Sequence, residues 1–366
     1  MSMSRRIVVL NWRDPWHPKA GGAELVTKRI VERLVERDWS VEWFSSAYAG
    51  AAAREAVAGV EYRRAGSQLS CRLDAWQRYR SEPATTLFVD QVNTLPFYAH
   101  LRFRGPTIAF FHQLAREIWH YETRFPLSLA AYIAEPLYLL PYRTVPIVTV
   151  SNSTRDDFLA MGHKSWIHVI PEAVDVAALS AVGAARGQNV IALGRVVPSK
   201  RFDHAIRAAA HLRGLGWRGT LDIAGSGDEA YVAKLKALAA RLSARVEFHG
   251  RVSEAQKVEL LARSALIWVT SVREGWGLIV TEAARLAVPA VVYDVPGLRD
   301  AVIDGVTGRV VKAEPPALAA ASATLLKSAD LARYGANALR EARTLSWERT
   351  ADSFESALLR RLRPGA

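Results

Sequence analysis

Apolar and polar positions follow two alternating patterns along this chain. Runs of four or five apolar residues alternate with longer stretches in which apolar residues recur every three or four positions. The short runs predict buried strands, and the longer stretches predict amphipathic helices. At 23–37, for example, Val26, Ile30 and Leu34 follow one another at four-residue spacing. Strand–helix alternation is typical of parallel sheets with helices on both faces, so we expect an α/β fold.

Twelve runs qualify as strands, and they fall into two groups of six. In the first half they lie at 7–11, 41–44, 87–90, 107–111, 147–150 and 166–170. In the second half they lie at 189–193, 221–224, 246–249, 266–269, 290–293 and 309–311.

A stretch of small residues at 176–188 separates the two groups and predicts a linker. A chain of 366 residues is long for one core, so two domains are expected. We predict an N-terminal domain at 1–180, a C-terminal domain at 181–346 and a final helix within 347–366.

Composition narrows the class of protein. The single cysteine, Cys71, excludes an internal disulfide framework and any multi-cysteine metal site, which fits a reducing cytoplasm. The longest apolar stretch, Pro126 to Tyr142, contains Glu135 and two prolines, and it is too short to cross a bilayer. It could be a core helix or a membrane contact, and the sequence leaves both open.

The formal net charge is +12, and most of the excess lies after residue 180. Such an excess suits an anionic ligand, an anionic membrane surface or nucleic acid, or it reflects a coding preference for arginine. The first half is also rich in arginine and tryptophan. This composition is typical of a surface that lies peripherally on an anionic leaflet near a lipid-linked acceptor, or of solvated arginines over a tryptophan-rich core.

Candidate binding residues follow the strands, because ligands of open α/β sheets bind outside the carboxyl ends of the strands. A long loop after the first strand carries His17 and ends at Gly21 and Gly22, directly before a helix. Two glycines there would let a phosphate approach the helix start, or would simply form a tight turn. Asp90 and Asn93 end another strand, where they could contact an acceptor or form a turn.

The second half carries cations and carboxylates at equivalent positions. Arg195 leaves a strand end and Lys200 lies five residues on, so together they could clamp a diphosphate, or they are solvated surface charges. Glu274 and Glu282 have seven residues between them. Eight helical steps span about 12 Å at most, a distance suited to two sugars flanking a diphosphate.

The string EGWGLIVTEA, followed by VPAVVYDVPGLRDAVIDGVTG, resembles the signature of retaining glycosyltransferases of family 4, which have the GT-B fold. Earlier pieces match in order, namely Gly21-Gly22, strand-end His112, the turn at 150–153, Ile170-Pro171 with Asp175, and the pair Arg195 and Lys200. The resemblance implies two Rossmann-like parallel-sheet domains facing a central cleft, with the C-terminal helix crossing back to the first domain.

The resemblance also implies roles for individual residues. His112, Arg195, Lys200 and Glu274 would be catalytic, with His112 and Glu274 on the transferring sugar and the two cations on the diphosphate. Glu282 would bind the ribose. The remaining donor contacts would be Gly21, Gly22, Arg251, Val252, Gly275, Trp276, Gly277 and Leu278. Three positions depart from the common family pattern, namely Glu172-Ala173 in place of Asn-Gly, Ala287 in place of glycine, and Trp276 in place of phenylalanine.

The chemistry expected from these residues is sugar transfer without a metal. No Asp-x-Asp motif occurs in the chain, so Arg195, Lys200 and helix N-termini would stabilise the leaving diphosphate. We expect no cofactor and no metal, a nucleotide-diphosphate sugar as donor, a hydroxyl-bearing acceptor, and no nucleic-acid partner. The rivals are a GT-B nucleotide-sugar epimerase and a basic nucleic-acid-binding protein, although no module for the latter is recognisable.

Overall fold

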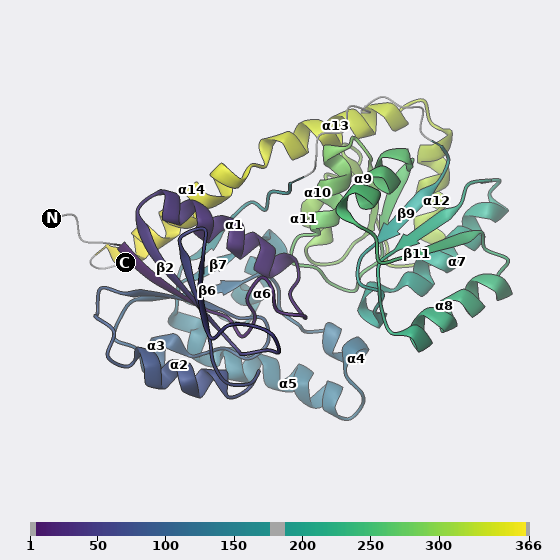
Figure 1. Ribbon diagram of the computed structural model, residues 1–366. Coiled ribbons are helices and arrows are strands. Elements are labelled where there is room, and N and C mark those ends of the chain that lie inside the picture. The colour runs from purple at the N-terminus through teal and green to yellow at the C-terminus, as the bar shows by residue number, and fades with distance from the viewer. Residues whose placement is uncertain (1–4, 176–186, 364–366) are drawn as a thin grey trace. The chain divides into compact units, whose positions relative to one another are not determined.

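The computed structural model describes residues 5–175 and 187–363, so most of the predicted linker lies outside the described residues. Two compact units form, each around its own sheet (Figure 1). Their described segments are 5–115, 133–173 and 346–363 in the first unit, and 116–132, 174–175 and 187–345 in the second. The segment 116–132, which we had placed in the N-terminal domain, therefore groups with the second unit.

The first unit is built on an eight-stranded sheet of order β3-β4-β2-β1-β5-β6-β7-β8. All neighbours pair in parallel except β3 and β4, which are antiparallel. The strands are β1 (Arg5–Leu10), β2 (Trp39–Ser45), β3 (Arg54–Val57), β4 (Val60–Arg64), β5 (Leu87–Gln91), β6 (Thr107–Phe111), β7 (Ile147–Thr149) and β8 (Ile167–Val169).

The hairpin of β3 and β4 was not predicted, because its residues carry no continuous apolar run. β3 alternates between exposed and half-buried positions, as an edge strand does. The two-residue turn at Ala58 and Gly59 takes positive φ at both positions, which matches the twist of a tight hairpin.

The second unit holds a six-stranded sheet of order β11-β10-β9-β12-β13-β14, parallel throughout. Both sheets have central strands that are buried on both faces, which explains their unbroken apolar runs. The strands are β9 (Val190–Leu193), β10 (Leu221–Ala224), β11 (Val246–Gly250), β12 (Leu266–Val269), β13 (Ala290–Tyr293) and β14 (Gly308–Val311). All six predicted strands of this half are present, and the predicted α/β class is confirmed.

Helices cover both faces of each sheet (Figure 1). Those before the linker are α1 (Gly22–Glu36), α2 (Cys71–Tyr79), α3 (Ala99–Arg102), α4 (Ile118–Glu122), α5 (Leu127–Leu139), the short 3-10 helix η1 (Leu140–Thr144) and α6 (Asn152–Ala160). Those after it are η2 (Pro198–Lys200), α7 (Phe202–Gly214), α8 (Glu229–Arg241), α9 (Glu254–Arg263), α10 (Leu278–Arg285), α11 (Leu298–Ala301), α12 (Pro315–Lys327), α13 (Leu331–Thr344) and α14 (Trp347–Leu362).

The C-terminal helix α14 returns to the first unit and packs beside α1, as predicted (Figure 1). Phe354 of α14 meets the ring of Phe110 on β6, with 5.3 Å between ring centroids. Arg37, at the end of α1, forms an ion pair of 2.8 Å with Glu355. Within the described ranges, none of the helices combines the length and the apolar character that crossing a bilayer demands.

Candidate functional site

In the second unit, Lys200 and Glu274 form an ion pair at the carboxyl end of the sheet. Lys200 ends η2, which follows β9, and Glu274 lies in the loop between β12 and α10. The same carboxylate oxygen accepts a hydrogen bond of 2.6 Å from Ser271. The structure therefore brings together a cation and a carboxylate that the sequence had suggested separately.

Glu282 lies on α10, one helix turn beyond its start, and pairs with Lys257 of α9 at 2.9 Å. Lys257 also contacts Glu254 at 2.8 Å. Burial raises the pKa of Glu282, and Lys257 offsets only part of that effect. Burial by itself would lower the pKa of Lys257, but the two carboxylates outweigh it and the pKa is raised. The sequence analysis missed Lys257, because only the packing of α9 on α10 brings it to Glu282.

The glycine-rich loop between the two carboxylates rests on the loop after β13. The backbone N–H of Glu274 donates to the carbonyl of Pro296 at 3.1 Å. A Cβ atom at Gly297 would lie 2.2 Å from the carbonyl oxygen of Glu274, so no larger residue fits there. Gly277 has φ +103° and begins α10, as the glycine pattern suggested. Gly297 was missed as a site residue, although it lies within the matching sequence string.

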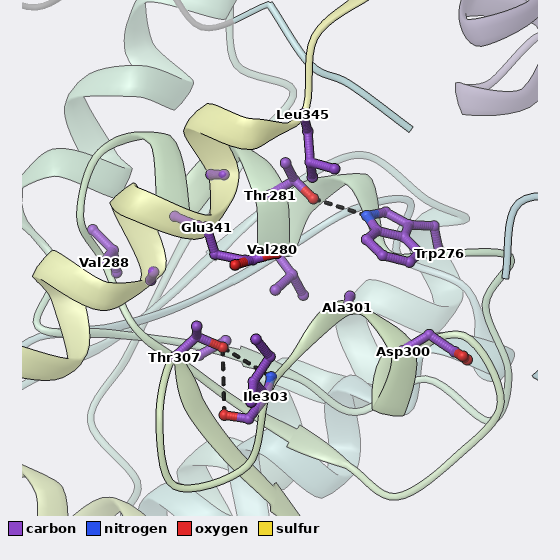
Figure 2. A pocket seen from close by; sticks show the side chains of 14 residues that line it. Trp276, Val280, Thr281, Val288, Asp300, Ala301, Ile303, Thr307, Glu341 and Leu345 are labelled. Carbon is purple, nitrogen blue, oxygen red and sulfur yellow. Dashed lines mark hydrogen bonds between the residues drawn. The ribbon is translucent and has the colours of Figure 1, made fainter. Parts of the chain in front are cut away.

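Trp276 lines a small cavity beside α10, α11 and α13 (Figure 2). Its indole N–H donates to Thr281 at 2.9 Å. The cavity has about 70 Å³, and neither Glu274 nor Glu282 lines it. Since pockets for nucleotide-sized ligands measure about 300–1,000 Å³, this cavity is not a nucleotide site.

The remaining donor candidates of this unit are placed as follows. Arg195 and Arg251 are exposed and follow β9 and β11 at the carboxyl edge. Val252, Gly275 and Leu278 are half-buried.

In the first unit, His112 follows β6 and lies between two buried polar side chains. Its Nδ1 atom is 3.0 Å from the Glu172 carboxylate, and its Nε2 atom is 3.3 Å from the side-chain nitrogen of Gln91. All three residues are buried. The Oε1 atom of Gln91 is also buried and has no hydrogen-bond partner.

The predicted helix start at Gly21 and Gly22 is present, and its first turn is organised by Glu24. This fully buried carboxylate accepts from the N–H of Gly21 at 2.8 Å and from Asn93 at 2.7 Å. It also pairs with Arg13 at 3.0 Å. A carboxylate therefore already neutralises part of the positive helix terminus. The sequence analysis missed Glu24, although a Glu three residues after Gly21 is a recognisable capping pattern.

The three acceptor candidates have different environments. Asn93 lies beside Glu24, at the carboxyl edge of the sheet. His17 packs edge-on against Trp12 and Tyr48, and burial lowers its pKa. Asp90 is fully buried and accepts from the N–H groups of residues 97 and 99 and from Tyr142. Both of its oxygens cap neighbouring backbone, which is the turn-forming role that the sequence left open, and acceptor contact by Asp90 stays a prediction.

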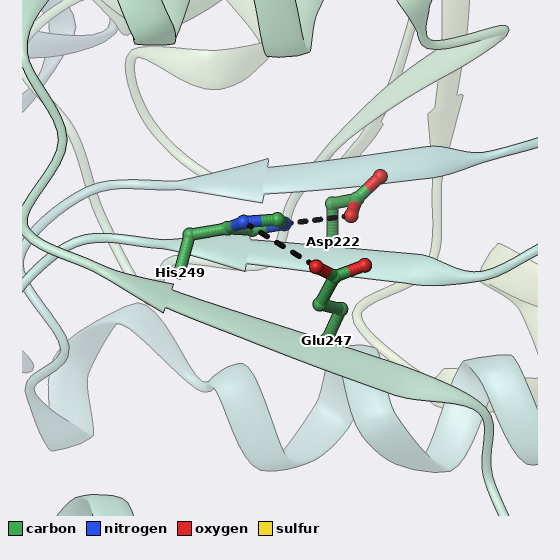
Figure 3. A group of neighbouring side chains, drawn as sticks. All are labelled: Asp222, Glu247 and His249. Carbon is green, nitrogen blue, oxygen red and sulfur yellow. Dashed lines mark hydrogen bonds and ion pairs between the residues drawn. The ribbon is translucent and has the colours of Figure 1, made fainter.

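One group of side chains in the described residues has the spacing to hold a metal ion, and it lies on β10 and β11 (Figure 3). His249 is 2.7 Å from Asp222, and Glu247 is 3.8 Å from the same ring. Asp222 also accepts from Asn189 at 3.1 Å and meets the guanidinium of Arg263 at 3.4 Å. Both oxygens of the buried carboxylate are thus satisfied by protein donors, one of them cationic, which is typical of a structural ion pair rather than a metal site.

Comparison with known proteins agrees with this arrangement. Residues 20–178 match the family model of Glycosyltransferase Family 4, and residues 184–341 match that of Glycosyl transferases group 1. The chain belongs to the family 4 glycosyltransferases. Two curated relatives are D-inositol 3-phosphate glycosyltransferases, from Nocardia farcinica with 34% identity over 216 residues and from Mycolicibacterium vanbaalenii with 32% over 190.

The matched regions of this glycosyltransferase cover 52% and 49% of its chain, and 48% and 42% of the two relatives, which is less than half of their length. Solved structures share the fold across almost the whole chain. Sucrose-phosphate synthase from Thermosynechococcus elongatus has a TM-score of 0.81 at 20% identity and covers 98% of this chain and 99% of its own. Anabaena Alr3699/HepE in complex with UDP-glucose has a TM-score of 0.75 at 19% identity, covering 97% and 99%. The GT-B expectation for the fold is confirmed.

Proposed function

We propose that this glycosyltransferase moves a sugar from a nucleotide-diphosphate sugar to a hydroxyl-bearing acceptor, with retention of anomeric configuration and without a metal ion. The observation that carries the proposal is the pair of lysine-held carboxylates, Glu274 with Lys200 and Glu282 with Lys257. Carboxylates accept hydrogen bonds from sugar hydroxyls, and the lysines attract a diphosphate. Both pairs flank one glycine-rich helix start.

In this proposal the residues divide the donor between them. Glu282 binds the ribose hydroxyls, and Glu274 binds the transferring sugar. Lys200 is held by Glu274 and, with the exposed Arg195, would neutralise the diphosphate. Arg251, Val252 and the backbone of 275–278 would supply the remaining donor contacts.

Breaking the bond between the anomeric carbon and the diphosphate oxygen leaves negative charge on the phosphate. Lys200, Arg195 and the start of α10 would stabilise that charge. The acceptor oxygen would form the new bond on the same face of the sugar, and its proton would pass to the departing phosphate oxygen. No covalent nucleophile is needed.

The first unit would contribute His112 to the transferring sugar, together with the helix start at Gly21 and Gly22. Asp90, Asn93 and His17 remain the candidates for contact with the acceptor, which could be a glycan, a lipid-linked sugar or a small molecule. A cytoplasmic place of action, expected from the single cysteine, also remains a prediction.

Release of nucleotide diphosphate from a panel of nucleotide sugars, first without acceptor, tests the proposal. UDP-glucose is the first donor to try, because HepE is described in complex with it. One donor should release nucleotide diphosphate, and activity should survive EDTA. Loss of activity in EDTA that magnesium or manganese restores would overturn the metal-independent mechanism.

The same assay separates the rivals. An epimerase would convert the sugar of its donor, which proton NMR of the recovered sugar would show. A nucleic-acid-binding protein would release nothing from any donor. With an acceptor in hand, the anomeric coupling constant of the product would show whether configuration is retained.

A further inference from the structure

Helix α5 (Leu127–Leu139) has its polar and apolar faces reversed relative to an ordinary surface helix. Its two strongly polar residues, Ser128 and Glu135, are 5% and 3% exposed. Glu135 accepts a hydrogen bond of 2.7 Å from the backbone N–H of Ala115, so its place inside the protein is fixed. An ordinary surface helix turns such residues toward water.

The outer side of this helix carries large apolar side chains instead. Ile133 is 56% exposed and Leu137 is 60% exposed, and Leu129 continues the stripe at four-residue spacing. We call the α5 apolar face the set Ile133, Leu137 and Leu140, the last of which directly follows α5; all three are exposed and belong to the first unit. An exposed apolar surface of this kind, on a segment with no exposed carboxylate, is typical of an interaction site.

The charges that border the α5 apolar face are positive. From residue 133, where the first unit resumes, to residue 150 the charged residues are Glu135 and Arg143, and of these only Arg143 reaches solvent; the exposed Glu122 lies in the segment that groups with the second unit. The face therefore combines an apolar centre with a cationic margin.

A second segment adds to this margin. Tyr98 donates a hydrogen bond of 3.0 Å to the carbonyl of Tyr138, which brings α3 and the loop before it against the second half of α5. In Figure 1, α3 and α5 lie on the same side of the first sheet. Leu101 of α3 is 63% exposed, and the neighbouring Arg102 and Arg104 are exposed as well. Between residues 91 and 111 the sequence has no acidic residue.

We propose that the α5 apolar face docks on the surface of an anionic phospholipid bilayer, with Leu101 inserted beside it and Arg102 and Arg104 on the lipid phosphates. An anionic leaflet satisfies both parts of the surface, since it takes up apolar side chains and attracts arginines. A second copy of this chain fits less well, because a symmetric contact would place arginines opposite arginines on a protein of net charge +12. The inference goes beyond the proposed reaction and does not depend on it.

The proposal also decides between the two interpretations that the sequence left open for the stretch from Pro126 to Tyr142. As a core helix, the stretch would bury its leucines. The structure buries Ser128 and Glu135 and, apart from the buried Leu139, exposes the leucines of the stretch, so the exposure favours the membrane-contact interpretation.

Sedimentation of the full-length chain with vesicles tests the inference. We expect the chain to pellet with phosphatidylcholine vesicles that contain phosphatidylglycerol and to remain in solution with phosphatidylcholine alone. Ile133→Gln with Leu137→Gln should weaken binding to the anionic vesicles on the order of 10- to 100-fold, because two side chains no longer enter the bilayer. Arg102→Gln with Arg104→Gln should weaken it on the order of 10-fold, and added salt should have the same effect.

Matched controls come from the second unit. Leu215 is 46% exposed, and Arg213 and Arg218 are exposed. Leu215→Gln, and Arg213→Gln with Arg218→Gln, should leave vesicle binding within about twofold of the unmodified chain, since such surface changes are nearly neutral. Melting temperatures of all variants establish that they fold.

The inference is overturned if the unmodified chain stays in solution with anionic vesicles, or if the α5 variants bind as well as their controls. It is also overturned in favour of a second copy if the unmodified chain is a dimer by light scattering, does not bind vesicles, and becomes a monomer in Ile133→Gln with Leu137→Gln. Nucleotide release measured without vesicles reports separately on the proposed transferase function.

Discussion

The carboxylate of Glu172 lies 3.0 Å from Nδ1 of His112, and both side chains are buried. Family 4 glycosyltransferases commonly have Asn at the position of Glu172, so this chain places a charged acceptor where an amide is usual. The carboxylate accepts a hydrogen bond from Nδ1–H, which leaves Nε2 as an acceptor facing the side-chain nitrogen of Gln91. Glu172, one of the departures from the family pattern, thus contacts His112, the proposed sugar-binding histidine.

Glu172→Gln should hold the His112 ring less firmly, because a neutral amide oxygen is a weaker acceptor for Nδ1–H than a carboxylate. A loss on the order of 10- to 100-fold in kcat/KM is expected, since a hydrogen bond to a charged group is worth about 1.5–3 kcal/mol. Steady-state kinetics with the donor sugar nucleotide measure this loss. Glu172→Asn, which restores the usual family residue, should retain more activity than His112→Ala. An unchanged kcat/KM in Glu172→Gln would show that the contact only fills space.

Glu274 and Glu282 should have separable effects on ligand binding. Glu274→Gln should impair sugar transfer while leaving the affinity for the bare nucleotide diphosphate nearly unchanged. Glu282→Gln should weaken both, because the ribose is common to both ligands. Each loss should be on the order of 10- to 150-fold for hydrogen bonds to a charged group. Calorimetric titration of nucleotide diphosphate decides the matter, and equal weakening by both variants would contradict the division of roles.

Lys257 should control the pH at which the nucleotide binds. Burial raises the pKa of Glu282, and Lys257 is the cation that opposes this. Lys257→Met should therefore raise that pKa further. Because the proposed ribose contact needs the carboxylate, nucleotide affinity should fall as the pH is lowered, and in the variant this fall should begin at a higher pH. Dissociation constants measured across a pH series test the shift.

Lys236→Met is the matched control, since Lys236 lies on α8, where its ammonium group is 5.7 Å from the ring of Phe248. It should leave the pH profile of nucleotide binding unchanged. A Lys257→Met profile that coincides with this control would argue against the assignment of Glu282 to the ribose.

Gly297→Ala should lower the activity of the folded enzyme as well as its stability. Its Cβ would meet the carbonyl oxygen of Glu274 at 2.2 Å and push the glycine-rich loop out of place. Gly305→Ala is a close control, because Gly305 has a similar φ of +75° and no atom within 4 Å of the added Cβ. The positive φ should cost both variants on the order of 1 kcal/mol of stability, and the clash should add a further loss in Gly297→Ala. Only Gly297→Ala should lower kcat/KM of the folded enzyme, and equal kinetics in the two would remove the loop from the mechanism.

The sequence by itself determined the class of fold and most of its elements. Continuous apolar runs such as Ile7 to Leu10 can be satisfied only by strands buried on both faces, and the stripe of Val26, Ile30 and Leu34 only by a helix on such a sheet. The matching string from Glu274 to Glu282 also identified the family, because its residues are adjacent in the chain. These features involve residues close together in the chain, so they can be recognised from the sequence alone.

Tertiary structure decided the contacts between residues far apart in the chain. Lys257 meets Glu282, and Gly297 supports Glu274, only because β12 and β13 are neighbours and α9 packs on α10. Asp90 looked like a site residue by its strand-end position, but the backbone that folds over it consumes both oxygens. For α5 the apolar composition was visible in the sequence, but the face of the helix that points into the protein was not. A run of leucines around one glutamate is compatible with either face inward, and the hydrogen bond from Ala115 to Glu135 fixes which face is buried.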